Sequence, residues 1–387
     1  MSGARRDEVG VADQGSTARE PREPGGTARR AEPDRRPGRR VRLKDVAARA
    51  GVSTGLVSLV LRNQPGPGAQ ARVRVFQAAQ DLGYRPDRSA SLLARRRSHH
   101  LGVMMDLRDT FHAELVAELD LAATGLGYDL VLGTLTPARD ERRASEILLD
   151  FRCEALILLG PQESAARLNS LGTQLPVVVI GRRVPDPTVD VVRAADDQGV
   201  ALAVGHLAAL GHRDIAFVDG GRGTVASDRR KGYREAMREL GLTSGLRIIA
   251  GGPAEAAGAR AAAALFDGER PPTAVVTSGD RAAVGLLDGL ARRGLPVPGA
   301  VSVVGYDDSM LARLAHVDLT TISQEPGQQA RQAIALAVDR LENGRPTPRE
   351  IVLSPRLVVR STTAAPATAA PVTARPAAAR AAIYLGF

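Results

Sequence analysis

Residues 43–63, LKDVAARAGVSTGLVSLVLRN, predict two short helices that are joined by a tight turn. Gly51 allows the positive φ angle that a sharp turn requires, at no steric cost. Apolar residues recur at helical spacing on both sides of this glycine, namely Val46, Ala47, Ala50, Val57, Val60 and Leu61. Two helices that pack through these faces at a steep angle would form a helix-turn-helix, although an ordinary helical hairpin has the same pattern.

The charge of the chain is distributed unevenly. Residues 1–98 hold 21 Lys+Arg and 10 Asp+Glu, a net charge of +11, whereas the other 289 residues hold 31 and 33. The basic excess therefore lies at the end that carries the two predicted helices. Such an excess is expected of a nucleic-acid-binding module, so it favours a DNA-binding helix-turn-helix over a structural hairpin.

Length and composition exclude several classes of protein. A chain of 387 residues predicts two or three domains. The single cysteine, Cys153, excludes an intrachain disulfide and a cysteine-cluster metal site, and we expect it to pack as a small hydrophobe. No GxxxxGK[ST] phosphate loop and no GxSxG nucleophile motif occurs, so we expect neither an enzyme nor a cofactor. The sequence has no membrane-spanning apolar run and no signal peptide, which predicts a cytoplasmic protein without a membrane partner.

Five segments are predicted along the chain. Residues 1–40, rich in Gly, Pro, Arg and Glu, are expected to form a disordered basic tail, and the Ala/Pro/Thr-rich residues 362–387 a second one. Residues 41–85 form the predicted DNA-binding domain, 86–98 a short helical stretch, and 99–361 the core. A third helix in the DNA-binding domain, from Ala69 to Leu82, is expected to bury Val73, Phe76, Ala79 and Leu82 on one face.

Beyond the short helical stretch, apolar strand-like runs alternate with amphipathic helical segments. The runs lie at 101–106, 128–133, 154–160, 176–181, 214–220, 246–251, 273–278 and 301–308, with helical segments such as 111–126, 197–210, 227–241 and 280–294 between them. Continuous Val/Ile/Leu strands with helical crossovers predict parallel sheets that are covered by helices on both faces. Eight such strands fit either one large sheet or two smaller doubly wound lobes.

With these elements in place, the chain resembles the lactose-repressor (LacI/GalR) family of bacterial transcription regulators over about residues 41–361. The motifs that carry the resemblance are LKDVAARAGVS (43–53), YRP (84–86), HLAALGHRDIAFV (206–218), GYREAM (232–237), PPTAVV (271–276), GLPVPGAVSVVGYDD (294–308) and LTTISQ (319–324). The resemblance implies an all-α helix-turn-helix headpiece, a hinge helix at 86–98, and a two-lobed core of doubly wound parallel sheets like the periplasmic sugar-binding proteins.

The resemblance also implies how the core is divided and what it binds. Lobe 1 would comprise about 99–194 and 323–349, and lobe 2 about 195–322 and 350–361. The chain would cross between the lobes near 194–196, 322–324 and 348–350. The family further implies a homodimer that binds a pseudo-palindromic double-stranded DNA operator, and an effector between the lobes that is a sugar-like or other polar metabolite.

Small and polar residues early in the second helix of the motif could approach base edges in the major groove. The candidates for DNA contact on and just after this helix are Thr54, Gly55, Ser58, Leu59, Arg62 and Asn63. Thr54 could equally cap the helix, as could Ser53. The family commonly has arginine where this chain has Leu59, which could contact a thymine methyl group or simply pack, while Arg62 and Asn63 could contact phosphates.

In the hinge, the resemblance places Leu93 where the family has a leucine that enters the minor groove, with Leu92 as the alternative register. An apolar wedge of this kind can unstack a base step and kink the duplex. Leu93 could also pack in the dimer. The basic run Arg95, Arg96 and Arg97 is expected to contact phosphates.

Ligands of doubly wound sheets bind at the carboxyl ends of strands, so residues that follow predicted strands are effector candidates. These candidates are Phe111, Arg182, Arg229, Asp307 and Gln324. Asp307 matches the family's carboxylate that accepts hydrogen bonds from effector hydroxyls, whereas Phe111 could stack on a ring or belong to the core. Gly181 and Gly279 stand where the family often has Asp and Asn, which removes two polar groups that hold sugar hydroxyls.

These observations predict a ligand-responsive, sequence-specific transcriptional regulator that represses a metabolic operon. The alternative is a constitutive DNA-binding protein whose core no longer senses a small molecule, because of the two glycines in the cleft. A free-standing solute-binding protein would have a signal peptide and no DNA-binding headpiece.

Overall fold

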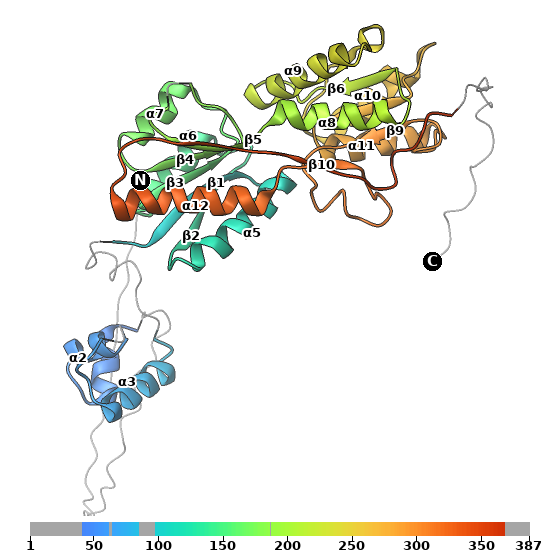
Figure 1. Ribbon diagram of the computed structural model, residues 1–387. Coiled ribbons are helices and arrows are strands. Elements are labelled where there is room, and N and C mark those ends of the chain that lie inside the picture. The colour runs from blue at the N-terminus through green and yellow to red at the C-terminus, as the bar shows by residue number, and fades with distance from the viewer. Residues whose placement is uncertain (1–40, 62–63, 85–96, 186, 368–387) are drawn as a thin grey trace, which may run out of the picture. The chain divides into compact units, whose positions relative to one another are not determined.

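The computed structural model describes residues 41–61, 64–84, 97–185 and 187–367. Contacts between residues divide the chain into two compact units, Met1–Ser91 and Leu92–Phe387. The described part of the first unit is a helical headpiece, and that of the second is an α/β core (Figure 1). None of the helices within the described ranges is long and apolar enough to cross a membrane.

The headpiece consists of α1 (Leu43–Ala50), α2 (Thr54–Leu61) and α3 (Ala69–Asp81). The chain turns between α1 and α2 at Gly51, whose φ of 66° and ψ of 40° are left-handed. The buried side chains of the three helices form one small core: Val46, Ala47, Ala50, Val57, Val60, Val75, Ala78 and Ala79. The predicted helix-turn-helix is confirmed, with Leu61 half-buried at its end.

The predicted buried face of α3 is wrong for two of its four residues, whereas Ala79 is buried and Leu82 packs against the headpiece core. Val73 and Phe76 are 68% and 52% exposed. The face that packs against α1 and α2 instead carries Val75, Ala78 and Ala79. Both faces are apolar at helical spacing, so the period alone could not choose between them. The alanine-containing face packs inward because its small side chains let α3 approach the other two helices closely.

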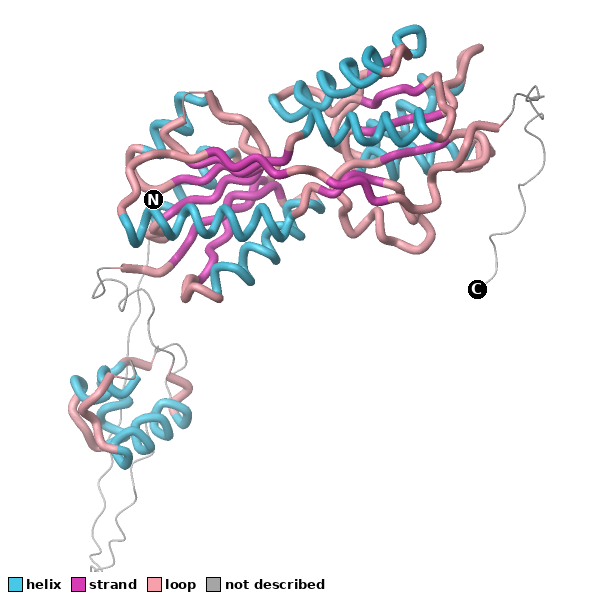
Figure 2. Tube along the Cα trace, in the orientation of Figure 1, coloured by secondary structure: helices cyan, strands magenta, loops and turns pink. Residues whose placement is uncertain are grey.

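Lobe 1 of the core is built on a six-stranded parallel sheet with the order β11-β5-β4-β3-β1-β2. Its strands are β1 (His100–Asp106), β2 (Asp129–Leu135), β3 (Ala155–Leu159), β4 (Val177–Ile180), β5 (Asp190–Ala194) and β11 (Glu350–Leu353). One face is covered by α5 (Thr110–Thr124) and α12 (Pro326–Asn343), and the other by α6 (Glu141–Asp150) and α7 (Ala165–Gly172) (Figure 2). Every residue of β3 is buried, as expected for a parallel strand between two helical layers.

Lobe 2 is built on a four-stranded parallel sheet with the order β7-β6-β8-β9. Its strands are β6 (Ile215–Val218), β7 (Arg247–Ile249), β8 (Ala274–Thr277) and β9 (Ser302–Val304). One face is covered by α8 (Asp196–Ala209) and α9 (Thr224–Glu239), and the other by α10 (Glu255–Phe266) and α11 (Asp280–Arg292). A separate antiparallel pair is formed by β10 (Thr321–Ser323) and β12 (Arg356–Val358). The two-lobed alternative is therefore the right one, and the predicted fold class is confirmed.

The chain crosses between the lobes at places that differ in part from the prediction. The first crossing joins β5 to α8 at Ala195, inside the predicted range 194–196. The second joins β10 to α12 at residues 324–325, slightly later than predicted, because Ser323 still pairs with Arg356 of β12 in lobe 2.

The third crossing was predicted at 348–350, and this placement is wrong. β11 pairs in parallel with β5, so residues 350–353 belong to lobe 1 and the chain crosses at 354–355. The cause is that β11 is a short edge strand with alternating exposed and half-buried residues. It therefore lacks the continuous apolar run that marked the interior strands.

The prediction that a free tail begins at residue 362 is also wrong. Thr362 Oγ1 accepts a hydrogen bond from the Thr320 N–H (2.9 Å) and donates one to the Val303 carbonyl (2.7 Å). The Ala364 carbonyl lies 2.9 Å from His212 Nε2. Residues 362–364 thus extend lobe 2 through hydroxyl and backbone atoms, which an apolar pattern does not reveal. The tails at 1–40 and 368–387 lie outside the described residues.

We expect His212 to reduce the stability of lobe 2 as the pH is lowered from about 7 to about 5, opposite in sign to the contribution of Asp280, whose pKa burial raises. His212 is 1% exposed, and burial lowers its pKa below the ordinary value of 6.5. The folded state then binds a proton less readily than the unfolded state, so folding weakens as the pH falls below the unfolded-state pKa. In thermal melting, the change in stability between pH 7 and pH 5 should be more favourable in His212→Gln than in the wild type, whereas exposed His316→Gln should follow the wild type. An unchanged profile in His212→Gln would assign the loss to other groups.

Candidate DNA-binding surface and effector site

Helix α2 has two distinct faces. Its buried face, Val57 and Val60, holds the helix against the rest of the headpiece core. Its outward face carries the four described DNA-contact candidates, of which Ser58 is half-buried and the others are exposed: Thr54, Gly55, Ser58 and Leu59. The Leu56 N–H donates to Ser53 Oγ (3.2 Å), so Ser53 caps the helix and Thr54 lies in its exposed first turn. With 39% of its surface exposed, Leu59 is not a core residue.

The remaining DNA-contact candidates, Arg62, Asn63, Leu93, Arg95 and Arg96, lie outside the described residues. Arg97, the last of the three arginines that were expected to contact phosphates, pairs with carboxylates of the core. Its guanidinium group donates to Glu154 Oε2 (2.9 Å) and to Glu342 Oε1 (2.9 Å), both in lobe 1. These partners are far away in sequence, so the basic run at 95–97 gave no indication that its last arginine is held by the core.

Asp307 follows β9 and lies in a left-handed turn with a φ of 116°. Its Oδ1 accepts a hydrogen bond from Gln324 Nε2 (2.6 Å) and lies 3.8 Å from Arg229 Nη1. Its backbone N–H donates to the Ile322 carbonyl (2.8 Å), which fixes the turn against the second crossing between the lobes. The structure thus brings together three of the five predicted effector residues, Asp307, Gln324 and Arg229.

Arg229 is a buried and firmly held member of this cluster. Its Nε donates to Asp196 Oδ1 (2.7 Å), and its Nη1 donates to the Ser278 carbonyl. The guanidinium carbon lies 3.7 Å from the centroid of the Tyr306 ring, in a cation–π contact. Burial alone would lower the pKa of Arg229, but the neighbouring Asp196 carboxylate outweighs this effect and raises it. Arg229 therefore stays charged, and its contacts fix its position beside Asp307.

The electrostatic environment of Asp307 indicates what could bind to it. Burial raises the pKa of its carboxyl group well above the ordinary value, Arg229 opposes this shift, and the carboxylates of Asp280 and Asp109 add to it. Such a group gains most from a ligand that donates hydrogen bonds or carries positive charge, because either stabilises the ionised form. A Cβ atom at position 279 would lie 3.3 Å from Asp307 Oδ2, so Gly279 lets the carboxyl group lie close to the backbone there.

Asp280, the first residue of α11, supports the turn that contains Asp307. Its Oδ2 accepts hydrogen bonds from the Ser309 N–H (2.7 Å) and Oγ (2.9 Å), and its Oδ1 accepts one from Thr321 Oγ1 (2.6 Å). Burial raises the pKa of Asp280 to about 6 in spite of these donors. The carboxyl group thereby connects the start of α11 with the loop after β9 and with the first residue of β10.

The other two predicted effector residues have different neighbours. Phe111 is 9% exposed and belongs to the lobe 1 core, in line with the core alternative. Arg182 is buried, and its Nη1 donates to the carbonyls of Pro161 (2.9 Å) and Glu163 (3.1 Å). Burial lowers the pKa of Arg182. Its guanidinium group therefore holds a loop of lobe 1 in place.

Within the described residues, ion pairs also bridge the two lobes. Glu114 of α5 pairs with Arg313 of lobe 2, and Arg183 of lobe 1 pairs with Asp228 of α9. The Met310 N–H donates to Glu114 as well. Partly exposed ion pairs contribute little individually, so the lobes could separate here without the loss of buried apolar contacts.

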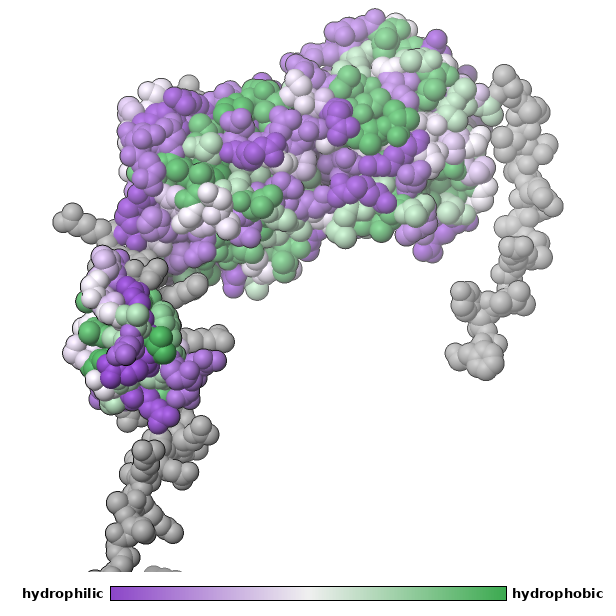
Figure 3. Space-filling model, turned by 60° about the horizontal axis from the view of Figure 1, so that its bottom comes forward, coloured by the Kyte–Doolittle hydropathy of each residue, from purple (hydrophilic) through white to green (hydrophobic). Residues whose placement is uncertain are grey.

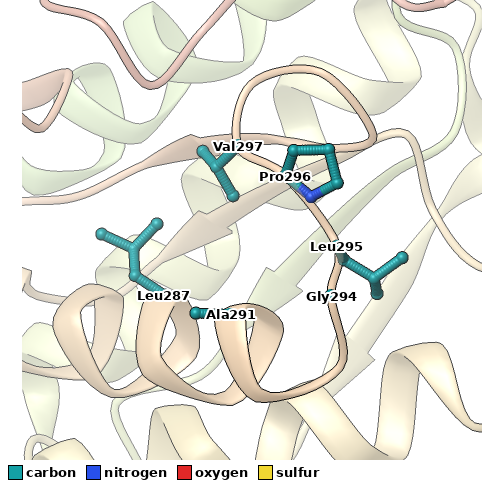
Figure 4. Close-up of a pocket in the computed structure, with 6 residues that line it drawn as sticks. All are labelled: Leu287, Ala291, Gly294, Leu295, Pro296 and Val297. Atoms are coloured by element: carbon teal, nitrogen blue, oxygen red, sulfur yellow. The ribbon is translucent and has the colours of Figure 1, made fainter. Parts of the chain in front are cut away.

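A groove elsewhere on lobe 2 has different chemistry. Its volume is about 340 Å³, and its lining is Leu287, Ala291, Gly294, Leu295, Pro296 and Val297 (Figure 4). These residues lie along the second half of α11 and just beyond it, whereas Asp280 begins the same helix, so at least about 10 Å of helix separates the two places. No charged side chain lines the groove, which makes it unsuitable for a polar effector.

Comparisons with known proteins identify the family. Residues 42–87 match the family described as "Bacterial regulatory proteins, lacI family", and residues 204–363 match a "Periplasmic binding protein-like domain". The HTH-type transcriptional regulator GalR of Escherichia coli (strain K12) is 33% identical over 331 residues, which cover 84% of this chain and 96% of GalR. The chain belongs to the LacI family. It is a DNA-binding transcriptional regulator and not an enzyme.

Solved structures of LacI-family regulators share this fold. A LacI transcriptional regulator from a Rhodococcus species is 42% identical, with a TM-score of 0.68, and the match covers 70% of this chain and all of that one. The lac repressor dimer bound to operator and the anti-inducer ONPF is 27% identical, with a TM-score of 0.73, and the match covers 84% of this chain and all of that one. This LacI-family regulator thus spans the length of its relatives.

Two polar residues near the cluster of this LacI-family regulator were missed by the sequence analysis. Asp219 and Ser278 directly follow the neighbouring strands β6 and β8. Among the described residues, Asp219 Oδ1 and Ser278 Oγ have no hydrogen-bond partner although both atoms are buried. The strand-end rule that located Asp307 would have found them, because both follow predicted apolar runs.

Asp280→Ala is expected to lower the free energy of unfolding of the regulator's core by about 2–4 kcal/mol. The substitution leaves the N–H and Oγ of Ser309 and the hydroxyl of Thr321 buried without their acceptor. Because the chain has no tryptophan, urea unfolding is followed by far-UV circular dichroism. As a control on the same helix, Asp288→Ala removes only an exposed ion pair with Arg292 and should cost less than about 0.5 kcal/mol. Equal losses in both variants would contradict the supporting role of Asp280.

Proposed function

We propose that this LacI-family regulator represses a metabolic operon by binding a pseudo-palindromic operator as a homodimer, and that a small polar effector changes its operator affinity. The observation that carries the proposal is the cluster of Asp307, Gln324 and Arg229 at the junction of the two lobes. This cluster occurs in a chain whose separate headpiece directs one face of α2 outward. Residues 41–85 are assigned to DNA binding, 86–98 to the hinge and the chain from 99 onward to effector binding.

The outward face of α2 has the chemistry for major-groove recognition. Thr54 and Ser58 can exchange hydrogen bonds with base edges, Gly55 allows close approach, and Leu59 can contact a thymine methyl group. Arg62, Asn63, Arg95 and Arg96 would contact phosphates, and Leu93 would enter the minor groove between base steps. The phosphate contacts predict an affinity that falls steeply with increasing salt concentration.

The effector would be a sugar-like or other polar metabolite that donates hydrogen bonds to Asp307. Gln324 and Arg229 both lie against Oδ1 of this carboxyl group, and the buried oxygens of Asp219 and Ser278 that lack a partner among the described residues supply further acceptors. Phe111 and Arg182 would shape the lobe 1 side of the site by holding α5 and the loop at 161–163. An effector that binds one arrangement of the lobes better by about 1–3 kcal/mol would change operator affinity by about 5- to 150-fold.

A homodimer would cover an apolar surface of lobe 1. Leu121 of α5 is 72% exposed, Leu126 beyond its end is 54% exposed, and Leu132 of the edge strand β2 is 46% exposed. Figure 3 shows hydrophobic patches among polar ones on the core. A two-fold dimer would place two headpieces on half-sites about one DNA turn apart, and sedimentation of the full chain at micromolar concentration tests this assembly.

Selection of duplexes from a random DNA pool by the full-length protein tests the function as a whole. We expect one enriched pseudo-palindrome, bound with a stoichiometry of two chains per duplex. A melting screen with mono- and disaccharides, nucleosides and amino acids should then find a compound that raises the melting temperature and changes affinity for the selected duplex. Enrichment without a sequence pattern would contradict operator recognition.

Gly181 and Gly279 favour one alternative, a constitutive DNA-binding regulator, because no polar side chain reaches into the site from these positions. The same screen separates the two functions. A selected operator combined with no stabilising compound, and with unchanged affinity in Asp307→Ala, would support the constitutive regulator.

A further inference from the structure

Arg97 is clamped at the point where the chain from the hinge enters the core. Its guanidinium group contacts three elements of lobe 1. It donates to Glu154 Oε2 just before β3 (2.9 and 3.0 Å), to the Tyr128 hydroxyl just before β2 (2.6 Å), and to Glu342 Oε1 in the last turn of α12 (2.9 Å). The neighbouring backbone is held too, since the His99 N–H donates to Glu154 Oε1 (2.9 Å).

Glu342 and Tyr128 make this clamp a connected network. The Tyr128 hydroxyl donates to the same Glu342 Oε1 that accepts from Arg97 (2.7 Å). Burial of Tyr128 and its contact with Glu342 raise its pKa to about 12, so the hydroxyl stays a neutral donor at physiological pH. A displacement of Glu342 therefore disturbs two hydrogen bonds at the entry of the core at the same time.

The other end of α12 lies at the proposed effector cluster. Gln324, whose side chain binds Asp307, precedes the helix by two residues. Its carbonyl accepts a hydrogen bond from Gln329 Nε2 (2.7 Å), which ties it to the first turn of α12. The 18 residues of α12 span about 27 Å, so one continuous helix reaches from the Asp307 cluster to the Arg97 clamp.

The packing of α12 allows it to move as one body. Its buried residues are three alanines, Ala330, Ala333 and Ala337, and the larger Gln329, Ile334 and Leu336. Near the C-terminal end of the helix, Arg340 pairs with the buried Asp190 of β5 (2.8 Å). The helix is stiff along its axis, so a small shift at one end is carried to the other. Shear of this kind between packed elements is a common form of conformational change in proteins.

We propose that α12 couples the Asp307–Gln324 cluster to the hinge, and that Glu342 is the positioning residue that sets the direction in which the chain leaves Arg97. The inference rests on the proposed function, because it assumes that the cluster responds to an effector. Loss or rearrangement of the Gln324–Asp307 bond shifts α12, Glu342 moves with it, and the clamp on Arg97 reorients the segment that leads to the headpiece.

A double-mutant cycle on the full-length chain tests this coupling without a known effector. Operator affinity is measured for the wild type, Gln324→Ala, Glu342→Gln and the double variant, with the duplex selected from the random pool as the probe. Residues that lie this far apart normally act additively, within about twofold in affinity. We expect the fold change in Kd of the double variant to differ by at least about fivefold from the product of the two single-variant fold changes. Additive effects would overturn the proposal.

Two further measurements make the cycle specific. The control pair combines Gln324→Ala with Glu146→Gln, which removes a partner of Arg142 and Arg143 on α6 of the same lobe and should be additive. Hydrogen exchange at the His99 amide should be faster in Gln324→Ala, and unchanged exchange would count against a shift of α12. If the wild type selects no operator, the proposed function fails; if it does and the cycle is additive, only the coupling through α12 fails.

Discussion

Val57→Asp is expected to abolish sequence-specific DNA binding and to leave the core folded. Val57 is fully buried in a headpiece core that has eight buried side chains among the described residues. An unpaired carboxylate in such a site costs several kcal/mol, which a domain of this size cannot offset. Affinity for the selected operator should therefore fall by at least about 10³-fold, to the nonspecific level. Gel-shift titration measures the affinity, and circular dichroism follows the unfolding of the core.

Gln70→Asp is the matched control, because it adds the same charge at an exposed position in the first turn of α3. Both variants lose the same long-range attraction to phosphates, so their difference isolates the folding of the helix-turn-helix. We expect Gln70→Asp to change operator affinity by less than about tenfold. Similar affinities for the two variants would mean that the headpiece is not the specific DNA-binding module.

The headpiece was predictable because its information is local. A turn glycine with apolar residues at helical spacing specifies two packed helices, and the structure has them at Leu43–Ala50 and Thr54–Leu61. The same rule failed for α3, where two apolar faces compete within one helix and only tertiary packing decides. The eight apolar runs of the core all became strands, including the partly buried edge strands β2 and β7. The mostly buried β5 was missed, because Asp190 and Arg193 interrupt its apolar run.

Elements that depend on distant partners were not predictable in this way. β11 is defined by its pairing with β5, and the docking of Thr362 is defined by Thr320 and Val303. For the same reason the sequence suggested a phosphate contact for Arg97, whose partners Glu154 and Glu342 come from other parts of the chain. Polar contacts between remote residues leave no period in the sequence.

The effector candidates show the same difference between features that a local sequence pattern predicts and features that depend on distant residues. The strand-end rule located Asp307, which follows β9 of the parallel sheet, whereas Arg229 lies within α9 and Gln324 follows β10 of the antiparallel pair. Arg229 and Gln324 join the cluster through tertiary contacts with Asp307. The position of a residue after a predicted strand does not distinguish side chains that face an open site from those that hold the surrounding structure in place. Arg182 binds two backbone carbonyls and Phe111 packs in the lobe 1 core, which only the three-dimensional arrangement reveals.

Asp307→Ala is expected to remove the response to an effector. The variant loses the acceptor that Gln324 holds in place, whereas Arg229 keeps its ion pair with Asp196 and is not left as an unpaired buried charge. A compound that changes wild-type operator affinity by about 5- to 150-fold should leave that of the variant unchanged within about twofold. Ligand-free operator binding should remain sequence-specific, because Asp307 lies outside the headpiece.

Asp308→Asn provides the control for this result, because the Asp308 carboxylate binds another part of the chain and not the cluster. Asp308 Oδ1 accepts a hydrogen bond from Arg360 Nη2 (2.6 Å), which ties the same turn to the strand segment that follows β12. If Asp307 contacts the effector, Asp308→Asn should lower thermal stability slightly and keep the response, while Asp307→Ala should lose the response without a comparable loss of stability. A full response in Asp307→Ala would show that its carboxyl group serves the fold, and the effector would then have to contact other residues at the strand ends, such as Asp219 and Ser278.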